Sequence, residues 1–361
     1  MSLKVGIVGA AGYAGAELIR LVLGHPEFEL VAITSNADAG QPLSAVYPSF
    51  AGVSDLVFTT HDAPELKSCN AVFLAVPHTA AMAQVPALLA AGVSCFDLSA
   101  DYRLSDPSVF EAWYAAEHTS PELLKTRAFG LPELFCRDLE IAASSHAAGK
   151  PVLVACAGCY PTATSLAAAP AVRAGWVAEN GPVIVDAISG VTGAGKSCNA
   201  RTHFCSADEN LEAYGVGKHR HTPEIEQILG LTDRVVFTPH LAPLRRGLLS
   251  TVTMPLAPQT LDTLALEDVV DHYKKFYAGR TFVRVLDAGQ QPKTASVVGT
   301  NAARLALRST SVRACWWRRV LSTICARVLR ARRSSAPTSF LALTSDEACP
   351  QWRARCSTFD C

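Results

Sequence analysis

Cys159 is the strongest candidate nucleophile in the chain. It follows Gly158 and precedes an apolar segment with helical spacing, Ala163–Ala174. Backbone N–H groups and the dipole at a helix N-terminus stabilise both a thiolate and an oxyanion, so a thiol in this place suits nucleophilic catalysis. Two alternatives remain open: a small buried thiol that only packs, and a dithiol redox site formed with Cys156 in a C-x-x-C pattern.

Two imidazoles lie close together in the segment 217–224, which reads Gly-Lys-His-Arg-His-Thr-Pro-Glu. His219 and His221 suit general acid/base work near neutral pH, and Glu224 adds a carboxylate. A solvated charged turn is the alternative. A metal site is not expected, because the two further histidines His203 and His240 show no ligand spacing.

Arg246 belongs to an Arg-Arg-Gly sequence that precedes a strand-like segment. A guanidinium there could bind a phosphate or carboxylate with two hydrogen bonds. The alternative is a basic strand end on the surface.

A glycine-rich turn, Gly9–Gly15, follows the apolar run Lys4–Val8 and leads into the helical segment Ala16–Leu23. Glycines in a strand–turn–helix unit let the backbone approach a pyrophosphate, which the helix N–H groups then bind. The spacing G-x-x-G-x-x-G is a weak motif alone, and a tight turn without ligand is the alternative. The next strand, Leu30–Thr34, is followed by Ser and Asn rather than an acid, which favours NADP over NAD, although Asp38 lies nearby.

Strands alternate with helices in the first part of the chain, which predicts a parallel sheet. Later segments predict a second α/β domain, and the boundary is expected near Ala155. The expected domains are a dinucleotide-binding domain at 1–155, a catalytic and oligomerisation domain at 156–305, and an aberrant tail at 306–361. The further predicted strands are Ala71–Val76, Val93–Leu98, Val152–Ala155, Val183–Ile188, Arg234–Thr238, Gly247–Met254 and Thr281–Val285, and the further predicted helices are Ala80–Ala91 and Leu264–Tyr277.

The composition excludes several classes of protein. With 361 residues, 49% hydrophobic and 18% charged residues and a formal net charge of +0, the chain is neither a disordered tail nor a protein dominated by nucleic-acid electrostatics. It has no run of 18 apolar residues and no signal-peptide pattern. We therefore expect a soluble, cytoplasmic protein whose 12 cysteines stay reduced, with no membrane or nucleic-acid partner.

The ordered motifs resemble those of the N-acetyl-gamma-glutamyl-phosphate reductase family, a relative of aspartate-semialdehyde dehydrogenase. The resemblance extends from residue 1 to about 305. The specific segments are Gly158–Thr162, Ser189–Gly195 and Lys218–Glu224, supported by Ala75–His78 and Asp97–Arg103. It implies a Rossmann-type domain followed by a glyceraldehyde-phosphate-dehydrogenase-like α/β domain, in a homodimer or homotetramer.

The resemblance also implies a reaction in arginine biosynthesis. The Cys159 thiolate would attack the acyl phosphate of N-acetyl-glutamyl phosphate, expel phosphate and form a thioester, which NADPH would reduce to the semialdehyde. His219 would be the acid/base, with His221 and Glu224 orienting or stabilising, and Ser99, Arg103 and Arg246 would bind the substrate. The implied cofactor-binding residues are Gly9, Ala11, Gly12, Tyr13, Ala14, Gly15, Ser35, Pro77, His78, Ser189, Gly190, Gly193 and Gly195.

The C-terminal segment departs from the family. From Arg308 onward there is no glycine and no lysine, but ten arginines, five cysteines and three tryptophans. If the nucleotides that encode Leu321 to Ser335 are read one position earlier, permitted codons give Ile-Asp-Asn-Leu-Cys-Lys-Gly-Ala-Ala-Gly-Ala-Ala-Val-Gln, which resembles the motif the family has there. This indicates a frameshift between about Asn301 and Val312.

Three alternatives to the reductase stay open. The chain could be an aspartate-semialdehyde dehydrogenase, which differs in substrate. It could be a disabled NADP-binding remnant, whose returning C-terminal helix is lost. A basic, poorly ordered tail that binds RNA is the third alternative.

Overall fold

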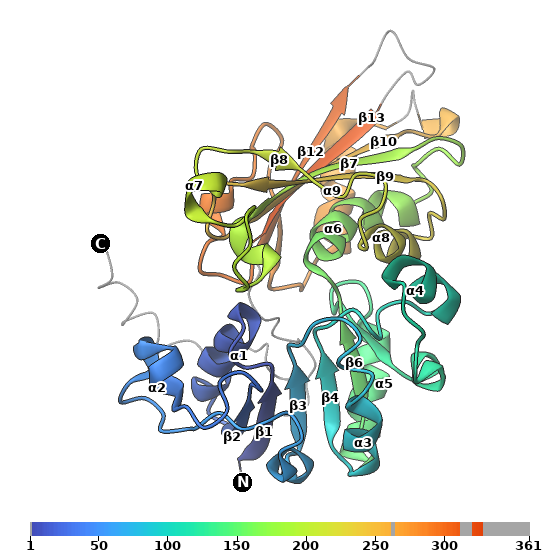
Figure 1. Cartoon of the computed structure of the whole chain (residues 1–361). Coiled ribbons are helices and arrows are strands. Elements are labelled where there is room, and N and C mark those ends of the chain that lie inside the picture. The colour runs from blue at the N-terminus through green and yellow to red at the C-terminus, as the bar shows by residue number, and fades with distance from the viewer. Residues whose placement is uncertain (1, 261–263, 311–319, 328–361) are drawn as a thin grey trace. The chain divides into compact units, whose positions relative to one another are not determined.

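The computed structural model describes residues 2–260, 264–310 and 320–327 (Figure 1). The described chain divides into two compact units. The first contains the residues up to Pro107 and the segment Ala116–Cys156, and the second contains Ser108–Ala115 and the residues from Ala157 onward. No helix in these ranges is long and apolar enough to cross a membrane.

The first unit is built on a six-stranded parallel sheet with strand order β2-β1-β3-β4-β6-β5. Its strands are short apolar runs, and β3 and β4 are buried along their whole length, as parallel strands covered on both faces are. The strands are β1 Leu3–Val8, β2 Phe28–Thr34, β3 Ala71–Leu74, β4 Ser94–Asp97, β5 Ala128–Gly130 and β6 Leu153–Cys156. The helices are α1 Tyr13–Leu23, α2 Leu43–Val46, α3 Val85–Ala90 and α5 Cys136–Ala147.

The strand order reverses between β1 and β3, because β2 lies on one side of β1 and β3 on the other. In open parallel sheets, ligands bind outside the carboxyl ends of the strands at this reversal. The loops after β1 and β3 are therefore the ones expected to meet a ligand.

The second unit contains a seven-stranded mixed sheet with order β11-β12-β13-β10-β7-β9-β8. The long helix α6 packs against β10 and α8 (Figure 1). Every residue of α6 from Tyr160 to Ala171 is buried. The strands are β7 Val183–Gly190, β8 Glu212–Ala213, β9 Val235–Ala242, β10 Leu248–Pro255, β11 Val283–Val285, β12 Ala303–Thr310 and β13 Val320–Arg327. The helices are α4 Pro107–Tyr114, α6 Cys159–Arg173, α7 Phe204–Ala207, α8 Thr222–Leu229 and α9 Leu266–Phe276.

All four predicted helices begin at another residue than predicted. The helix predicted from Ala16 begins at Tyr13 and the one predicted from Leu264 begins at Leu266, and the other two differ more. The helix predicted at Ala80–Ala91 begins only at Val85, because the preceding residues form turns fixed by side-chain hydrogen bonds. The helix predicted at Ala163–Ala174 begins at Cys159. In the segment of changed composition, β12 and β13 pair with each other and β13 pairs with β10, whereas 311–319 and 328–361 lie outside the described residues.

Candidate active site

Cys159 is the first residue of α6, and Gly158 is the N-cap, with extended φ and ψ of −64° and 166°. The Gly158 carbonyl accepts hydrogen bonds from the backbone N–H of Thr162 at 3.0 Å and from its hydroxyl at 2.7 Å. The half-buried Cys159 thiol therefore lies where the first helical turn leaves N–H groups without an intrahelical partner. This is the position at which a thiolate is stabilised.

Glu224 fixes the turn before Cys159. Its carboxylate Oε1 accepts a hydrogen bond from the Gly158 backbone N–H at 2.7 Å, and the side chain is 1% exposed. Glu224 lies in the first turn of α8, where the helix dipole favours a negative charge. Glu224 is thus bound to the main chain of the turn that precedes Cys159.

Tyr160 joins the Cys159 turn to the two histidines. Its ring meets the imidazoles of His219 and His221 edge to face, with centroid distances of 5.8 and 5.9 Å. Its hydroxyl donates to the His240 carbonyl at 3.2 Å and accepts from the Tyr214 hydroxyl at 3.2 Å. The structure therefore brings Cys159, His219 and His221 to one place in the second unit.

His219 lies in an aromatic setting. Its ring centroid is 5.4 Å from that of Tyr214, 5.2 Å from Phe237 and 4.9 Å from His221. Burial, together with the charge of Arg220, lowers the pKa of His219 to about 4. The imidazole is therefore neutral at pH 7.

The tautomer of His219 follows from its own hydrogen bond. The His221 backbone N–H donates to His219 Nδ1 at 3.2 Å. Since Nδ1 is the acceptor, the proton of the neutral ring is on Nε2. His219 is thus equipped to donate a hydrogen bond or proton to an oxygen.

The second glycine loop packs against the segment that carries the paired arginines. A Cβ on Gly190 would lie 2.5 Å from the Leu244 carbonyl oxygen, so only glycine permits this approach. Val191 N–H donates to the same carbonyl at 2.8 Å, and the Thr192 hydroxyl donates to the Arg245 carbonyl at 2.6 Å. The exposed Arg246 follows directly in this segment.

The members of that loop differ in their surroundings. The Ser189 hydroxyl donates to the Gly190 carbonyl at 3.1 Å, and a Cβ on Gly193 would lie 2.8 Å from that hydroxyl oxygen. Gly195 has a φ of 93°, which favours glycine. Ser189 and Gly190 are buried, whereas Gly193 and Gly195 are exposed.

In the first unit, the glycine turn has the close contacts of a nucleotide-binding turn. A Cβ on Gly9 would lie 2.5 Å from the Ala75 carbonyl oxygen, and one on Gly15 would lie 2.5 Å from Ala10 Cα. A Cβ on Gly12, the N-cap of α1, would lie 3.5 Å from the Gly9 carbonyl oxygen, an ordinary van der Waals distance. The backbone from Tyr13 to Gly15 therefore offers the first-turn N–H groups of an 11-residue helix, and these fit a pyrophosphate.

The end of β2 carries an acid as well as the hydroxyl. The Ser35 hydroxyl donates to Asp38 Oδ2 at 2.6 Å. Asn36 Oδ1 accepts from the His61 backbone N–H at 2.9 Å. Asp38 thus lies beside the residue expected to meet the ribose 2′ position, where a carboxylate suits a hydroxyl better than a phosphate.

Two residues expected to bind substrate are held by the backbone of the first unit. Arg103, 9% exposed, donates from Nε to the Cys156 carbonyl at 2.9 Å and from Nη2 to the Leu98 carbonyl at 2.7 Å. The Ser99 hydroxyl accepts from the Asp101 N–H at 3.1 Å. The guanidinium therefore supports the end of β6, three residues before Cys159.

Tyr160, Tyr214 and Asp101 are residues of the site or its supporting loops that the sequence did not predict. Tyr160 and Asp101 lie inside motifs that the sequence analysis used. A tyrosine at the start of a helix is usually a core residue, and an aspartate in a loop is usually solvated, so neither was expected to have a role in the site. Tyr214 precedes Gly215, whose φ of 59° and closeness to His219 mark a built turn. The Gly215 that directly follows Tyr214 was the available sequence signal for this turn.

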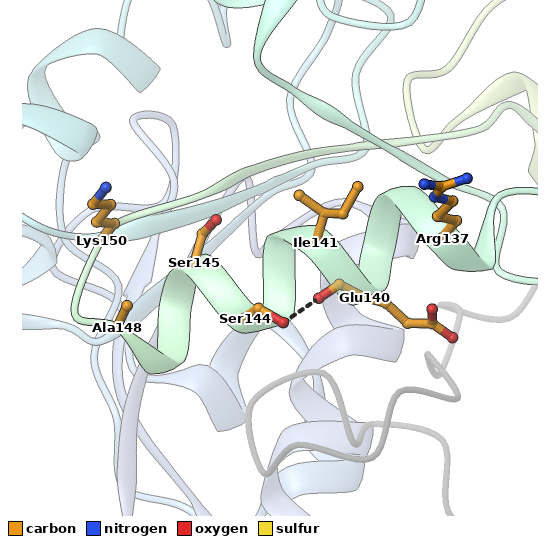
Figure 2. Close-up of a pocket in the computed structure, with 7 residues that line it drawn as sticks. All are labelled: Arg137, Glu140, Ile141, Ser144, Ser145, Ala148 and Lys150. Carbon is orange, nitrogen blue, oxygen red and sulfur yellow. Dashed lines mark hydrogen bonds between the residues drawn. The ribbon is translucent and has the colours of Figure 1, made fainter.

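A hollow of about 510 Å³ lies elsewhere in the first unit, along α5 (Figure 2). Figure 2 shows the Ser144 hydroxyl donating to the Glu140 carbonyl within that helix, at 2.9 Å. None of the predicted site residues lines it. The lining residues are Arg137, Glu140, Ile141, Ser144, Ser145, Ala148 and Lys150. Among the residues that the structure describes, no group of three or more His, Cys, Asp and Glu side chains could hold a metal ion.

Comparisons with known proteins match both units. Residues 4–152 match the family "Semialdehyde dehydrogenase, NAD binding domain", and residues 159–316 match "Semialdehyde dehydrogenase, dimerisation domain". N-acetyl-gamma-glutamyl-phosphate reductase of Symbiobacterium thermophilum is 44% identical over 313 residues, which are 85% of this chain and 86% of that protein. The protein of the same name from Neisseria meningitidis serogroup C is 40% identical over 319 residues, 87% of each chain.

Solved structures of lower identity share the fold. Aspartate semialdehyde dehydrogenase II of Vibrio cholerae, complexed with ASA, has a TM-score of 0.65 at 12% identity, over 91% of this chain and 93% of that one. Aspartate semialdehyde dehydrogenase with NADP from Candida albicans has a TM-score of 0.64 at 16% identity, over 90% and 93%. At these identities the likeness concerns the fold alone, which is the expected pair of a Rossmann-type and a second α/β domain.

Proposed function

The chain belongs to the N-acetyl-gamma-glutamyl-phosphate reductase family, and from this premise we propose that it reduces N-acetyl-glutamyl phosphate to N-acetyl-glutamate semialdehyde and phosphate with NADPH. One observation carries the chemistry. Cys159 begins α6 at a turn that the buried Glu224 holds, next to the ring cluster that contains His219.

In this proposal Cys159 is the nucleophile. Its thiolate attacks the acyl carbon, the C–S bond forms, and the C–O bond to phosphate breaks to leave a thioester. The cofactor, when bound, supplies the hydride that reduces this thioester. The N–H groups of the first turn of α6 stabilise the sulfur and the developing oxyanion.

His219 manages the proton on oxygen. Its Nε2–H donates to the hemithioacetal oxygen when that oxygen carries negative charge, and takes the proton back when the C–S bond breaks. His221 supports it by fixing Nδ1 through its backbone N–H. Glu224 is a positioning residue, because its carboxylate is used on the Gly158 N–H.

The anionic substrate needs cations. Arg246 is exposed beside the second glycine loop and is the candidate for the substrate carboxylate or phosphate. Arg103 binds the main-chain carbonyl of Cys156 and so positions the chain that leads into the catalytic turn.

The cofactor would bind at the glycine turn of the first unit. Gly9, Gly12 and Gly15 shape the turn, and the N–H groups of Tyr13 and Ala14 would hold the pyrophosphate. Pro77 and His78 would border it, and Ser35 would meet the ribose. Since Asp38 accepts a hydrogen bond from the Ser35 hydroxyl, we expect a modest rather than absolute preference for NADPH over NADH. The second glycine loop, with Ser189, Gly190, Gly193 and Gly195, is proposed to line the nicotinamide side.

A substrate comparison tests the proposal against aspartate-semialdehyde dehydrogenase. The purified protein is assayed for phosphate-dependent oxidation of N-acetyl-glutamate semialdehyde and of aspartate semialdehyde. We expect turnover of the first at least tenfold above the second in kcat/KM. Faster turnover of aspartate semialdehyde would overturn the substrate, and NADPH binding without turnover of either would indicate the disabled remnant.

We further propose a homodimer or homotetramer, since the second unit matches a dimerisation-domain family. Sedimentation at micromolar concentration is the measurement. A single species at the monomer mass would contradict it.

A further inference from the structure

The loop between β3 and α3 contains a strained residue, Thr79. Thr79 has a φ of 72°, in the left-handed region that β-branched residues rarely occupy. Such a conformation costs free energy and persists only where neighbouring groups hold it. Thr79 is exposed, so packing of its own side chain does not account for it.

Asp101 fixes the backbone of this loop. Its Oδ1 accepts a hydrogen bond from the Thr79 backbone N–H at 2.6 Å, and its Oδ2 accepts one from the Met82 backbone N–H at 3.0 Å. The side chain is completely buried. Hydrogen bonds to a carboxylate are stronger than neutral ones, and burial removes the competition of water.

Asp101 is itself fixed by the loop after β4. Its N–H donates to the Ser99 hydroxyl at 3.1 Å, and its carbonyl is hydrogen-bonded to His118 Nε2 at 2.9 Å. A rigid loop therefore determines the conformation of its neighbour.

The loop held in this way borders the glycine turn. β1 and β3 are adjacent, and Ala75 N–H continues the pairing by donating to the Val8 carbonyl at 2.8 Å. The Gly9 Cα approaches Ala75 and Val76 so closely that an added Cβ would lie 2.5 Å and 3.2 Å from their atoms. Residues 77–79 thus follow directly after Ala75 and Val76, the two residues that contact the glycine turn.

We propose that Asp101 is a positioning residue for cofactor binding, which holds residues 77–79 in the conformation that receives the nicotinamide dinucleotide. The identity of the ligand rests on the proposed function, whereas the claim that Asp101 fixes this loop rests on the two hydrogen bonds alone. Asp101 acts through the backbone N–H groups of Thr79 and Met82 and needs no contact with the cofactor.

The test uses Asp101→Asn, which keeps the size but replaces one acceptor oxygen by an NH₂ group. NADPH binding is measured by fluorescence titration of the full chain. We expect the Kd and the KM for NADPH to rise about tenfold or more, with kcat changed less than about threefold, because only a charge-assisted hydrogen bond that shapes the loop is lost. Asp55→Asn, an exposed acid of the same unit, is the matched control and leaves the Kd unchanged.

A rescue separates positioning from general destabilisation. Glycine adopts the left-handed conformation without strain, so Thr79→Gly added to Asp101→Asn restores most of the NADPH affinity. Amide hydrogen exchange at Thr79 and Met82 in the cofactor-free protein is faster in Asp101→Asn than in the wild type.

Either of two results overturns the proposal: wild-type Kd and exchange rates in Asp101→Asn, or a weakened affinity that Thr79→Gly leaves unrescued. If the wild-type chain binds no NADPH, the proposed function fails instead. The exchange rates at the two amides would then still decide whether Asp101 holds the loop.

Discussion

His219 illustrates how surroundings assign a role to a residue. The rings of Tyr160, Tyr214 and Phe237 remove water from the imidazole, and the pKa falls to about 4. A histidine whose folded-state pKa is below its unfolded value of about 6.5 stays neutral at pH 7. The ring is then a donor through Nε2, available over the whole range near neutrality.

His219→Gln tests this role. We expect kcat to fall about 10²- to 10⁴-fold, the usual contribution of a general acid or base. The unfolded state binds the His219 proton between pH 6.5 and about 4 and the folded state does not, so this group makes stability decrease as pH falls through that window. Urea unfolding at pH 7 and pH 5 should therefore show a smaller loss for the variant than for the wild type. An equal loss would contradict the low pKa.

The hydrogen bond between Glu224 and the Gly158 N–H leads to a second prediction. Glu224→Ala leaves the buried Gly158 N–H without its acceptor, which costs about 1–3 kcal/mol of unfolding free energy. Glu224→Gln keeps an acceptor oxygen and should retain most of the stability and activity. Urea unfolding compares the two, and a Gln variant as damaged as the Ala variant would show that the charge, rather than the hydrogen bond, matters.

At the scale of elements, period and glycine placement predicted much of the first unit. The apolar runs predicted β1, β2, β3, β4 and β6 to within two residues at each end. The beginnings of α3 and α6 were missed for a physical reason. Asp101 accepts the Met82 N–H from another loop, and Glu224 holds Gly158 from 66 residues away in sequence. Such long-range acceptors leave no local signal.

The candidate site shows the same division. Motifs predicted Cys159, His219 and Glu224 as site residues, a prediction that stays one, and the structure places all three at one turn and its ring cluster. What each side chain binds could not be predicted, because it depends on distances between atoms. The hydrogen bond from the Gly158 N–H shows that Glu224 binds the main chain, and the one from the His221 N–H determines the His219 tautomer.

The glycine turn supports a prediction for a whole element. A Cβ at Gly15 would lie 2.5 Å from backbone atoms of Gly9 and Ala10, so Gly15→Ala must push α1 away from β1. We expect loss of NADPH binding and a lower melting temperature of the first unit. Gly12→Ala is the matched control for folding, because its Cβ would lie at an ordinary van der Waals distance of 3.5 Å from the Gly9 carbonyl oxygen and its φ of −77° suits alanine. A melting temperature lowered equally in both would contradict this packing.

At the scale of the whole molecule, the similarity to known proteins stops before the chain does. The dimerisation-domain family matches up to residue 316, and the relative from Symbiobacterium thermophilum aligns with 85% of the chain. The segment of changed composition begins at about the same place. We propose that the reading frame shifts there.

Sequencing the transcript over codons 300–315 tests the shift. We expect a one-nucleotide difference that restores the Ile-Asp-Asn-Leu motif. A transcript that encodes the printed sequence, together with a native intact mass of 38.3 kDa, would contradict the shift.

The central claim is that the Cys159 sulfur forms the covalent intermediate. The most direct measurement compares Cys159→Ser with the exposed-cysteine control Cys198→Ser, by intact mass after mixing with N-acetyl-glutamyl phosphate in the absence of NADPH. We expect an N-acetyl-glutamyl adduct on the wild type and on Cys198→Ser, with none on Cys159→Ser and no turnover by that variant. An adduct or near-normal turnover in Cys159→Ser would contradict it.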